Sequence, residues 1–217
     1  MPEVRLRYTT LEIGDMDVHI RMLRDNLQYH DKDGVAEKLG ISSATWPLFG
    51  VVWPSSEVLA HLMSDYNVEG KRVLEVGCGI ALASLVLNRR LADITATDYH
   101  PETEGFLVYN AGLNQDEVIP FVRTGWADAQ DDELGVFDLI IGSDLLYENE
   151  SVELLSSFVN QHAGLHCDVV IVDPDRGFHA KFSKKMVTLG YSHSQEKPET
   201  TDYLEKLYKG QILTYSR

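Results

Sequence analysis

Three apolar stretches of the sequence each end in residues that could contact a ligand. The stretch VLEVGCGIALAS, residues 73–84, runs into a turn that contains Gly77 and Gly79. Glycines in such a turn let the backbone approach a ligand closely. The stretch ITATD ends in Asp98, about 20 residues further on, and a carboxylate there suits the two hydroxyls of a ribose. A third stretch, FDLIIGSD, ends in Asp144. This spacing predicts a site for a ribose-containing ligand with a second acid beside it.

Three kinds of ligand compete for the glycine turn. A phosphate-binding P-loop requires Gly-Lys-Ser/Thr, but Ile80, Ala81 and Leu82 follow Gly79. A dinucleotide fingerprint requires a third glycine where Leu82 stands. S-adenosylmethionine has no phosphate, has a ribose for Asp98, and has an adenine that needs an apolar or aromatic wall. The pattern therefore favours S-adenosylmethionine, with a dinucleotide as the weaker alternative and an ordinary helix cap as another reading of Asp98.

The elements that must position these residues alternate regularly after residue 70. A strand followed by a helix, repeated, is typical of a parallel sheet with helices on both faces. The last two strands have no helix between them and are expected to pair antiparallel. We therefore expect an α/β, Rossmann-like seven-stranded sheet that is mostly parallel with an antiparallel C-terminal strand. The expected strands are 72–77, 93–98, 118–123, 137–144, 167–173, 191–196 and 206–216, and the expected helices are 81–91, 101–114, 151–162 and 179–190.

The segment before this alternation has a different pattern. Residues 4–23 alternate around Gly14-Asp15, which predicts a short hairpin. Residues 25–50 are rich in loop-forming residues, and residues 53–66 have the apolar spacing of a helix. An N-terminal extension is thus expected to pack on the α/β core.

Charge narrows the choice of partner. The chain has 217 residues and a net charge of −15, and from Thr124 to Asp175 it has twelve acids and no Lys or Arg. Such a surface repels a phosphate backbone, so a basic protein or peptide is a more plausible partner than a nucleic acid. The alternative is that the acids only keep the protein soluble.

Composition also bears on the compartment. Cys78 and Cys167 are the two cysteines, which fits a reduced, cytoplasmic protein without a disulfide framework. No run of 18 apolar residues is present, so we expect no membrane-spanning helix. The start, MPEVRLRYTT, lacks the apolar middle of a signal peptide.

Five motifs carry a family resemblance. LEVGCG, TDYHPE, FLVYNAGLN, GWAD and GSDLLYE occur in the order and spacing of the seven-β-strand methyltransferases. VVWPSSEVLAHLM and Asp144-x-x-Tyr147 resemble, more narrowly, the branch that modifies lysine on chaperones, calmodulin and electron-transfer flavoprotein, which has a histidine-modifying relative. The resemblance covers roughly residues 50–180. It implies a methyltransferase domain over 51–217, an N-terminal extension over 1–50, and methyl transfer from S-adenosylmethionine to a nitrogen of a protein lysine.

The resemblance also implies roles for individual residues. Trp53 matches the residue that closes the cofactor pocket, Asp98 the ribose-binding acid, and Trp126 an aromatic beside the adenine. Asn110 and Asn114 match helix positions of the same pattern. The implied cofactor-binding set is Trp53, Glu75, Gly77, Cys78, Gly79, Asp98, Trp126 and Ser143.

Asp144 and Tyr147 match the family's motif at the mouth of the methyl-transfer site. A carboxylate there would attract and orient a lysine, with Tyr147 as a wall or hydrogen-bond partner. By itself, however, the carboxylate would raise the pKa of the lysine amine, so desolvation or release of the proton to solvent must remove it. The plain alternative is that Asp144 only caps the next helix. Arg176 either lines the substrate entrance or forms a surface ion pair.

Other features limit the chemistry. No histidine spacing typical of a metal site is present: His162 and His166 are four apart but flank Gly164 at an expected helix end, so no metal is expected. His100 follows Asp98 closely and could lie near the cofactor, but a surface turn is the expected position. The family often has glycine where Ala81 stands, and Asp175 in DPDRG takes the place of a glycine in the flavoprotein-modifying members.

Two other functions stay open at this point. The enzyme could methylate a small amine or other metabolite, or the chain could be a non-catalytic binding module with the same fold. The Asn/Asp-Pro-Pro-Tyr/Phe motif of base-modifying enzymes is absent after the fourth strand, which argues against a nucleic-acid substrate.

Overall fold

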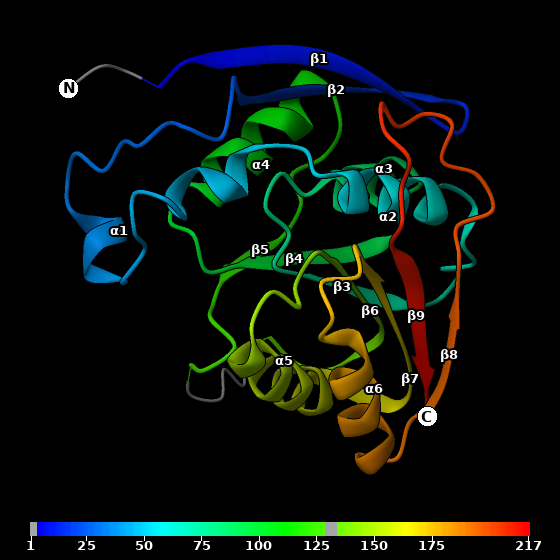
Figure 1. The fold of residues 1–217 in the computed structure, drawn as a ribbon. Coiled ribbons are helices and arrows are strands. Elements are labelled where there is room, and N and C mark those ends of the chain that lie inside the picture. Colours follow the sequence, from blue (N-terminus) through cyan, green and yellow to red (C-terminus); the bar gives the residue numbers. More distant parts are fainter. Residues whose placement is uncertain (1–3, 129–133) are drawn as a thin grey trace.

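The computed structural model describes residues 4–128 and 134–217, and a seven-stranded sheet forms their centre (Figure 1). The strands lie in the order β5-β4-β3-β6-β7-β9-β8. Their bounds are β3 Arg72–Val76, β4 Asp93–Asp98, β5 Phe121–Arg123, β6 Phe137–Ser143, β7 Ala163–Asp173, β8 Ser192–Glu196 and β9 Gln211–Ser216. The helices are α1 Val35–Lys38, the 3-10 helix η1 Trp46–Gly50, α2 Pro54–Asp65, α3 Leu82–Arg89, α4 Thr103–Leu113, α5 Asn149–His162 and α6 His179–Thr188.

The sheet has the predicted directions. Strands β5, β4, β3, β6 and β7 pair in parallel, whereas β9 runs antiparallel to both of its neighbours, β7 and β8. Parallel neighbours require a crossover, and a helix provides one between most successive strands. The predicted α/β class and the antiparallel C-terminal strand are therefore confirmed.

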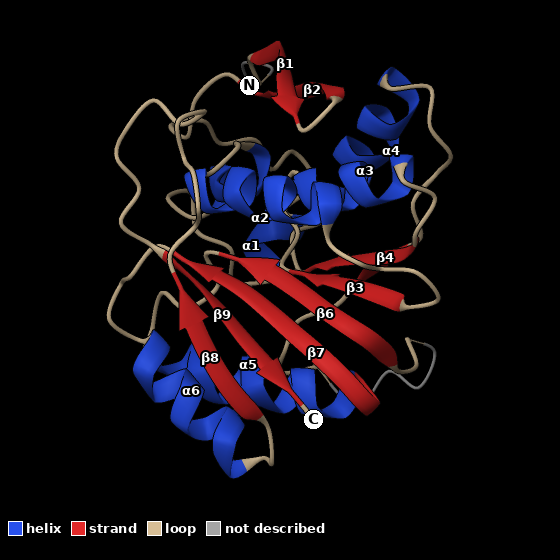
Figure 2. Cartoon of the chain, turned by 90° about the vertical axis from the view of Figure 1, so that its right-hand side faces the viewer, coloured by secondary structure: helices blue, strands red, loops and turns tan. Residues whose placement is uncertain are grey.

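Helices cover both faces of the sheet, as predicted. Figure 2 shows α2, α3 and α4 on one face and α5 and α6 on the other. Each face has its own cluster of buried apolar side chains, and the central strands β6 and β7 are apolar on both sides because both faces are covered. Among residues 4–128 and 134–217, no helix is long and apolar enough to cross a membrane.

Some element boundaries differ from the expected ones. β5 begins at Phe121 rather than residue 118, because Pro120 has no N–H to donate and only its carbonyl joins the sheet, accepting from Ala96 at 2.9 Å. β7 begins at Ala163, four residues earlier than expected, because α5 leads straight into it. The loop-rich segment 25–50 contains the short helices α1 and η1.

The predicted N-terminal hairpin is present as β1 Leu6–Ile13 and β2 Met16–Leu23. Two buried asparagines, Asn110 in α4 and Asn114 at the C-cap of α4, bind the backbone of β2. Asn110 accepts from the N–H of Arg21 at 2.8 Å and donates to its carbonyl at 3.2 Å. Asn114 accepts from the N–H of His19 at 2.8 Å and donates to its carbonyl at 2.7 Å. Both side chains thus pair with the backbone of β2 as a neighbouring strand would, and they hold the hairpin on the sheet domain. The domain boundary between residues 50 and 51 stays a prediction.

Replacing Asn114 by alanine should lower the free energy of unfolding by about 2–3 kcal/mol. The change leaves the N–H and carbonyl of His19 without their partner, and an unsatisfied buried group costs about 1–3 kcal/mol. Urea unfolding measures the difference. Asn67→Ala, at an exposed position, is the control and should change stability by less than about 0.5 kcal/mol. Equal effects of the two changes would contradict the role given to Asn114.

Candidate active site

The glycine turn lies at the carboxyl end of β3, where a parallel sheet places its ligands. Gly77 and Gly79 both have left-handed φ angles, 58° and 53°. A Cβ on Gly77 would lie 2.6 Å from a methyl of Leu145, and one on Gly79 would lie 3.0 Å from the carbonyl oxygen of Phe49. Both positions therefore require glycine for conformation and for space. Ala81, where the family often has glycine, also has a left-handed φ, 58°.

Asp98 ends β4, the parallel neighbour of β3, and its carboxylate holds the turn. Oδ2 accepts from the Gly79 N–H at 2.8 Å and Oδ1 from the His100 N–H at 2.8 Å. Burial raises the pKa of Asp98, and these backbone donors oppose the rise. Asp98 is not a cap for α4, whose N-cap is Glu102. The helix-cap reading is therefore wrong, and the carboxylate is placed beside the glycine turn.

Glu75 lies fully inside the base of the turn and ties it to α3. Its Oε2 accepts from the Ser84 N–H at 2.8 Å and also from the Ser84 hydroxyl. Burial raises the pKa of Glu75 to about 7, while the hydrogen bonds from Ser84 oppose the rise.

Stability should therefore depend on the protonation of Glu75. The pKa of Glu75 is higher in the folded chain, about 7, than the 4.5 of an unperturbed glutamate, so the folded state binds the proton more tightly. Its stabilising contribution is complete below pH 4.5 and is lost as pH rises through 7, by about 3 kcal/mol. Glu75→Gln imitates the protonated form. Its stability relative to the wild type should rise by about that amount between pH 4.5 and 8 in urea unfolding; parallel curves would contradict the assignment.

Cys78 contributes its backbone rather than its thiol. Its N–H donates to the Thr97 carbonyl at 3.0 Å, which pins the turn to β4. Burial raises the pKa of the Cys78 thiol well above its usual range, so the sulfur stays protonated and unreactive.

Aromatic residues surround the turn. Trp126 lies half-buried after β5, with its ring 3.5 Å from where a Gly77 Cβ would be. Trp53 is the N-cap of α2, and its indole N–H donates to the Leu48 carbonyl at 2.9 Å. Trp126 thus lies beside the glycine turn, where the site is predicted. The indole N–H of Trp53 instead donates to a carbonyl of η1.

His100 is not in a surface turn, which corrects the expectation. Its ring is buried and stacks on Phe49, with ring centroids 3.9 Å apart. Burial lowers the pKa of His100 to about 4, so the ring is neutral at physiological pH. The stacking fastens η1 to the segment after Asp98.

The end of β6 carries Ser143 and, in a left-handed conformation with φ 56°, Asp144. The Asp144 N–H donates to the Val172 carbonyl at 2.9 Å. α5 has Glu148 as its N-cap, so Asp144 does not cap that helix. Tyr147 lies on the loop between β6 and α5, and 56% of its surface is exposed.

Arg176 forms a two-point ion pair with Asp144. Its Nε donates to Oδ1 and its Nη2 to Oδ2, both at 2.8 Å, and the side chain of Asp144 is 14% exposed. The hydrogen bonds to Asp144 raise the pKa of Arg176. Of the two readings of Arg176, the ion pair is present, and its partner is the acid predicted for the mouth of the site.

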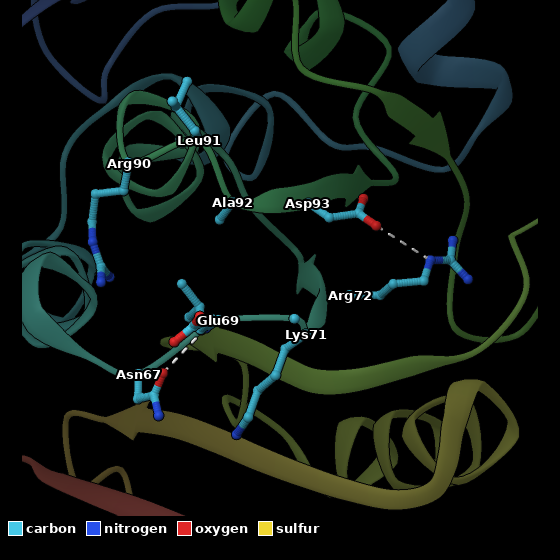
Figure 3. A pocket seen from close by; sticks show the side chains of 10 residues that line it. Asn67, Glu69, Lys71, Arg72, Arg90, Leu91, Ala92 and Asp93 are labelled. Carbon is cyan, nitrogen blue, oxygen red and sulfur yellow. Dashed lines mark hydrogen bonds and ion pairs between the residues drawn. The ribbon is translucent and has the colours of Figure 1, made fainter.

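A surface hollow of about 640 Å³ lies at the other end of the sheet, before β3 and β4 (Figure 3). Its cationic side chains have partners already. Lys71 donates to Asp168 at 3.0 Å, Arg72 pairs with Asp93 at 3.7 Å, and Arg90 donates to backbone carbonyls. This hollow is opposite to the carboxyl ends of the strands and shares no residue with the candidate site.

The residues at the carboxyl ends of β3, β4 and β5 suit S-adenosylmethionine. A carboxylate lies beside a glycine turn whose backbone has no room for Cβ atoms, and an indole lies next to the same turn. The sequence does not indicate that Phe49 lies against Gly79 and stacks on His100, because both contacts depend on the path of residues 25–50.

Comparison with known proteins identifies relatives of this chain. METTL21E, a protein-lysine methyltransferase of Bos taurus, is 34% identical over 130 residues, covering 54% of this chain and 44% of the relative. The calmodulin-lysine N-methyltransferase of Arabidopsis thaliana is 27% identical over 202 residues, covering 87% of this chain and 65% of the relative. The chain spans about half the length of the first curated relatives it matches.

Solved structures share the fold. The magnesium protoporphyrin IX methyltransferase of Synechocystis, solved with bound S-adenosylmethionine, superposes with a TM-score of 0.57 at 22% identity, covering 75% of this chain and 77% of that one. A 16S rRNA methyltransferase of T. thermophilus gives 0.64 at 13% identity, covering 100% and 51%. Residues 37–186, well over half of the chain, match the family described as lysine methyltransferase. The chain therefore belongs to the lysine methyltransferase family.

Proposed function

We propose that the protein transfers a methyl group from S-adenosylmethionine to the side-chain nitrogen of a protein lysine. The observation that carries the proposal is the contact of Asp98 with the Gly79 N–H, in a chain of the lysine methyltransferase family. The bound cofactor supplies an electrophilic methyl on a sulfonium. Catalysis then consists of positioning the amine in line with that methyl and excluding water.

In this proposal, Asp98 binds the ribose hydroxyls and the Gly77–Gly79 backbone lies against the methionine part. Trp126 provides the wall for the adenine. The Ser143 backbone lies below the cofactor, and Trp53 closes the pocket on the side of η1. Glu75 contacts the ligand only through the turn, because Ser84 occupies its Oε2.

The Asp144–Arg176 pair explains how a carboxylate at the site could orient a lysine amine that must be neutral to react. A carboxylate alone would raise the pKa of the incoming amine and keep it protonated. Arg176 takes one lone pair on each oxygen and offsets the charge, while the remaining lone pairs can still accept a hydrogen bond from an amine. Asp144 can therefore orient a neutral amine without favouring its protonation.

The substrate we propose is a basic segment of a protein. Two exposed acids follow Asp144, Glu148 in the loop before α5 and Glu150 in the first turn of α5. The segment from Thr124 to Asp175 has twelve acids and no Lys or Arg. This field attracts lysine-rich chains and repels nucleic acid. We also propose a cytoplasmic location, which the two free cysteines, Cys78 and Cys167, support.

Two measurements test the proposal. Calorimetry with S-adenosylhomocysteine should show one binding site, and no binding at high micromolar ligand would overturn the cofactor assignment. Incubation of a cell lysate with tritiated cofactor should label a protein, and mass spectrometry should place the methyl group on lysine. Label confined to small molecules would indicate metabolite methylation. Binding of S-adenosylhomocysteine without any labelled product would indicate a non-catalytic module.

A further inference from the structure

The turn from β7 to α6 gathers three metal-ligating side chains that the proposed methyl transfer does not use. One carboxylate oxygen of Asp173, one of Asp175 and a ring nitrogen of His179 lie within 4.8 Å of one another. In the sequence they form Asp-x-Asp followed by a histidine four residues on. The spacing of the histidines predicts no metal site, but that spacing does not include this mixed set of two carboxylates and one imidazole.

The ligand atoms are suitably spaced for one ion. The Nδ1 of His179 lies 3.3 Å from Oδ1 of Asp175. Neighbouring ligands of a tetrahedral zinc ion, with bonds of about 2.1 Å, are roughly 3.4 Å apart. Small side-chain rotations would bring Asp173 to the same distance, since all three atoms already lie within 4.8 Å.

Asp173 has an unsatisfied carboxylate oxygen in the interior. The residue is 0% exposed, and its Oδ1 accepts from the Asp175 N–H at 2.8 Å. Its Oδ2 has no hydrogen-bond partner among the described residues, and neither has Nδ1 of His179. A buried polar atom without a partner is rare and indicates a ligand, a water or a proton that completes it.

Local charge favours a cation as the missing partner. The ion pair of Asp144 and Arg176 adds no net charge to this region. Asp173 and Asp175 then leave two carboxylate charges to balance beside the ring of His179. The N-terminus of α6 contributes a partial positive charge of about one half, which is too small to do so. A divalent cation would balance the pair.

We propose that Asp173, Asp175 and His179 bind a divalent transition-metal cation of the zinc type. An imidazole with two carboxylates suits such ions, whereas magnesium and calcium prefer oxygen ligands alone. The cation would join the end of β7 to the first turn of α6. It would thereby fix the turn that carries Arg176, and it needs no part in the methyl-transfer step.

The test is a titration of chelator-treated, untagged full-length protein with zinc chloride in a calorimeter. One equivalent should bind. Asp175→Asn is the main variant, because the residue is exposed and asparagine tolerates its φ of 68°. His179→Ala is the second variant. His166→Ala, which changes an exposed histidine elsewhere on β7, is the matched control. Circular dichroism confirms that each variant is folded.

The expected result is a loss of zinc affinity of at least about tenfold in both variants and none in the control, since even changes behind metal ligands cost about 10–100-fold. The cobalt(II) form should show the visible bands of oxygen and nitrogen ligands without a sulfur charge-transfer band. Binding that is unchanged by Asp175→Asn and His179→Ala would overturn the proposal. So would an absence of binding, which would leave a proton shared by His179 and the carboxylates as the partner.

Discussion

Replacing Asp98 by alanine should weaken S-adenosylhomocysteine binding by at least about 100-fold. In the proposed complex, the carboxylate accepts two hydrogen bonds from the ribose, and hydrogen bonds to a charged group contribute about 1.5 kcal/mol or more each. The change also frees the N–H of Gly79, which Asp98 holds at 2.8 Å, so the turn loses its position as well. Calorimetry with the purified variant gives the dissociation constant.

Asp93→Ala is the matched control for Asp98→Ala. Asp93 begins the same strand, β4, and is exposed at the opposite end, where it pairs with Arg72 at 3.7 Å. Its removal takes away an equal charge without touching the site, so the affinity should stay the same. Equal affinity in the wild type and in Asp98→Ala would remove the ribose assignment, whatever the control shows.

Replacing Asp144 by asparagine should lower the rate of methyl transfer by about 100-fold while leaving S-adenosylhomocysteine affinity unchanged. The asparagine amide has one acceptor oxygen, so it cannot accept hydrogen bonds from Nε and Nη2 of Arg176 at two atoms. The guanidinium and the side chain that orients the substrate therefore both lose their positions. Misplacement of a reacting group by about 1 Å can cost 100-fold in rate. Initial rates of tritium transfer to the labelled lysate protein, at saturating cofactor, measure the effect.

Two further variants separate charge from position in this pair. Asp93→Asn removes an exposed acid at the opposite end of the sheet and should leave the rate within about twofold, as expected for a surface change. Arg176→Lys keeps the positive charge but loses the two-point geometry, so a partial loss of rate is expected. A full rate in Asp144→Asn would show that the acid neither orients the substrate nor needs its arginine.

The sequence predicted the sheet well because alternating strands and helices leave few topologies. The parallel order, the antiparallel β9 and the helices on both faces follow from that alternation. The positions of Gly77, Gly79 and Asp98 were also predictable, since they follow consecutive strands that end at the same edge. Asp98 therefore had to lie beside the glycine turn.

Other contacts depend on backbone conformations that a pattern does not reveal. Asp144 and Asp175 both have left-handed φ angles, 56° and 68°, and the pairing of Asp144 with Arg176 joins residues from separate loops. Asp175 and Ala81 stand where family members have glycine, and this replacement is the hint of a left-handed conformation that the sequence contains. The resemblance points to Asn110 and Asn114, but no sequence pattern shows that these side chains bind the backbone of β2.

The carbonyl of Phe49 against Gly79 has a practical consequence for truncation. A fragment beginning at residue 51 would match the domain boundary that the motifs indicate. It would nevertheless uncover the glycine turn, remove the ring that stacks on His100 and leave Asn110 and Asn114 without the backbone of β2. The smallest piece that folds with an intact pocket should therefore include the hairpin, and recombinant fragments for crystallisation should begin before β1.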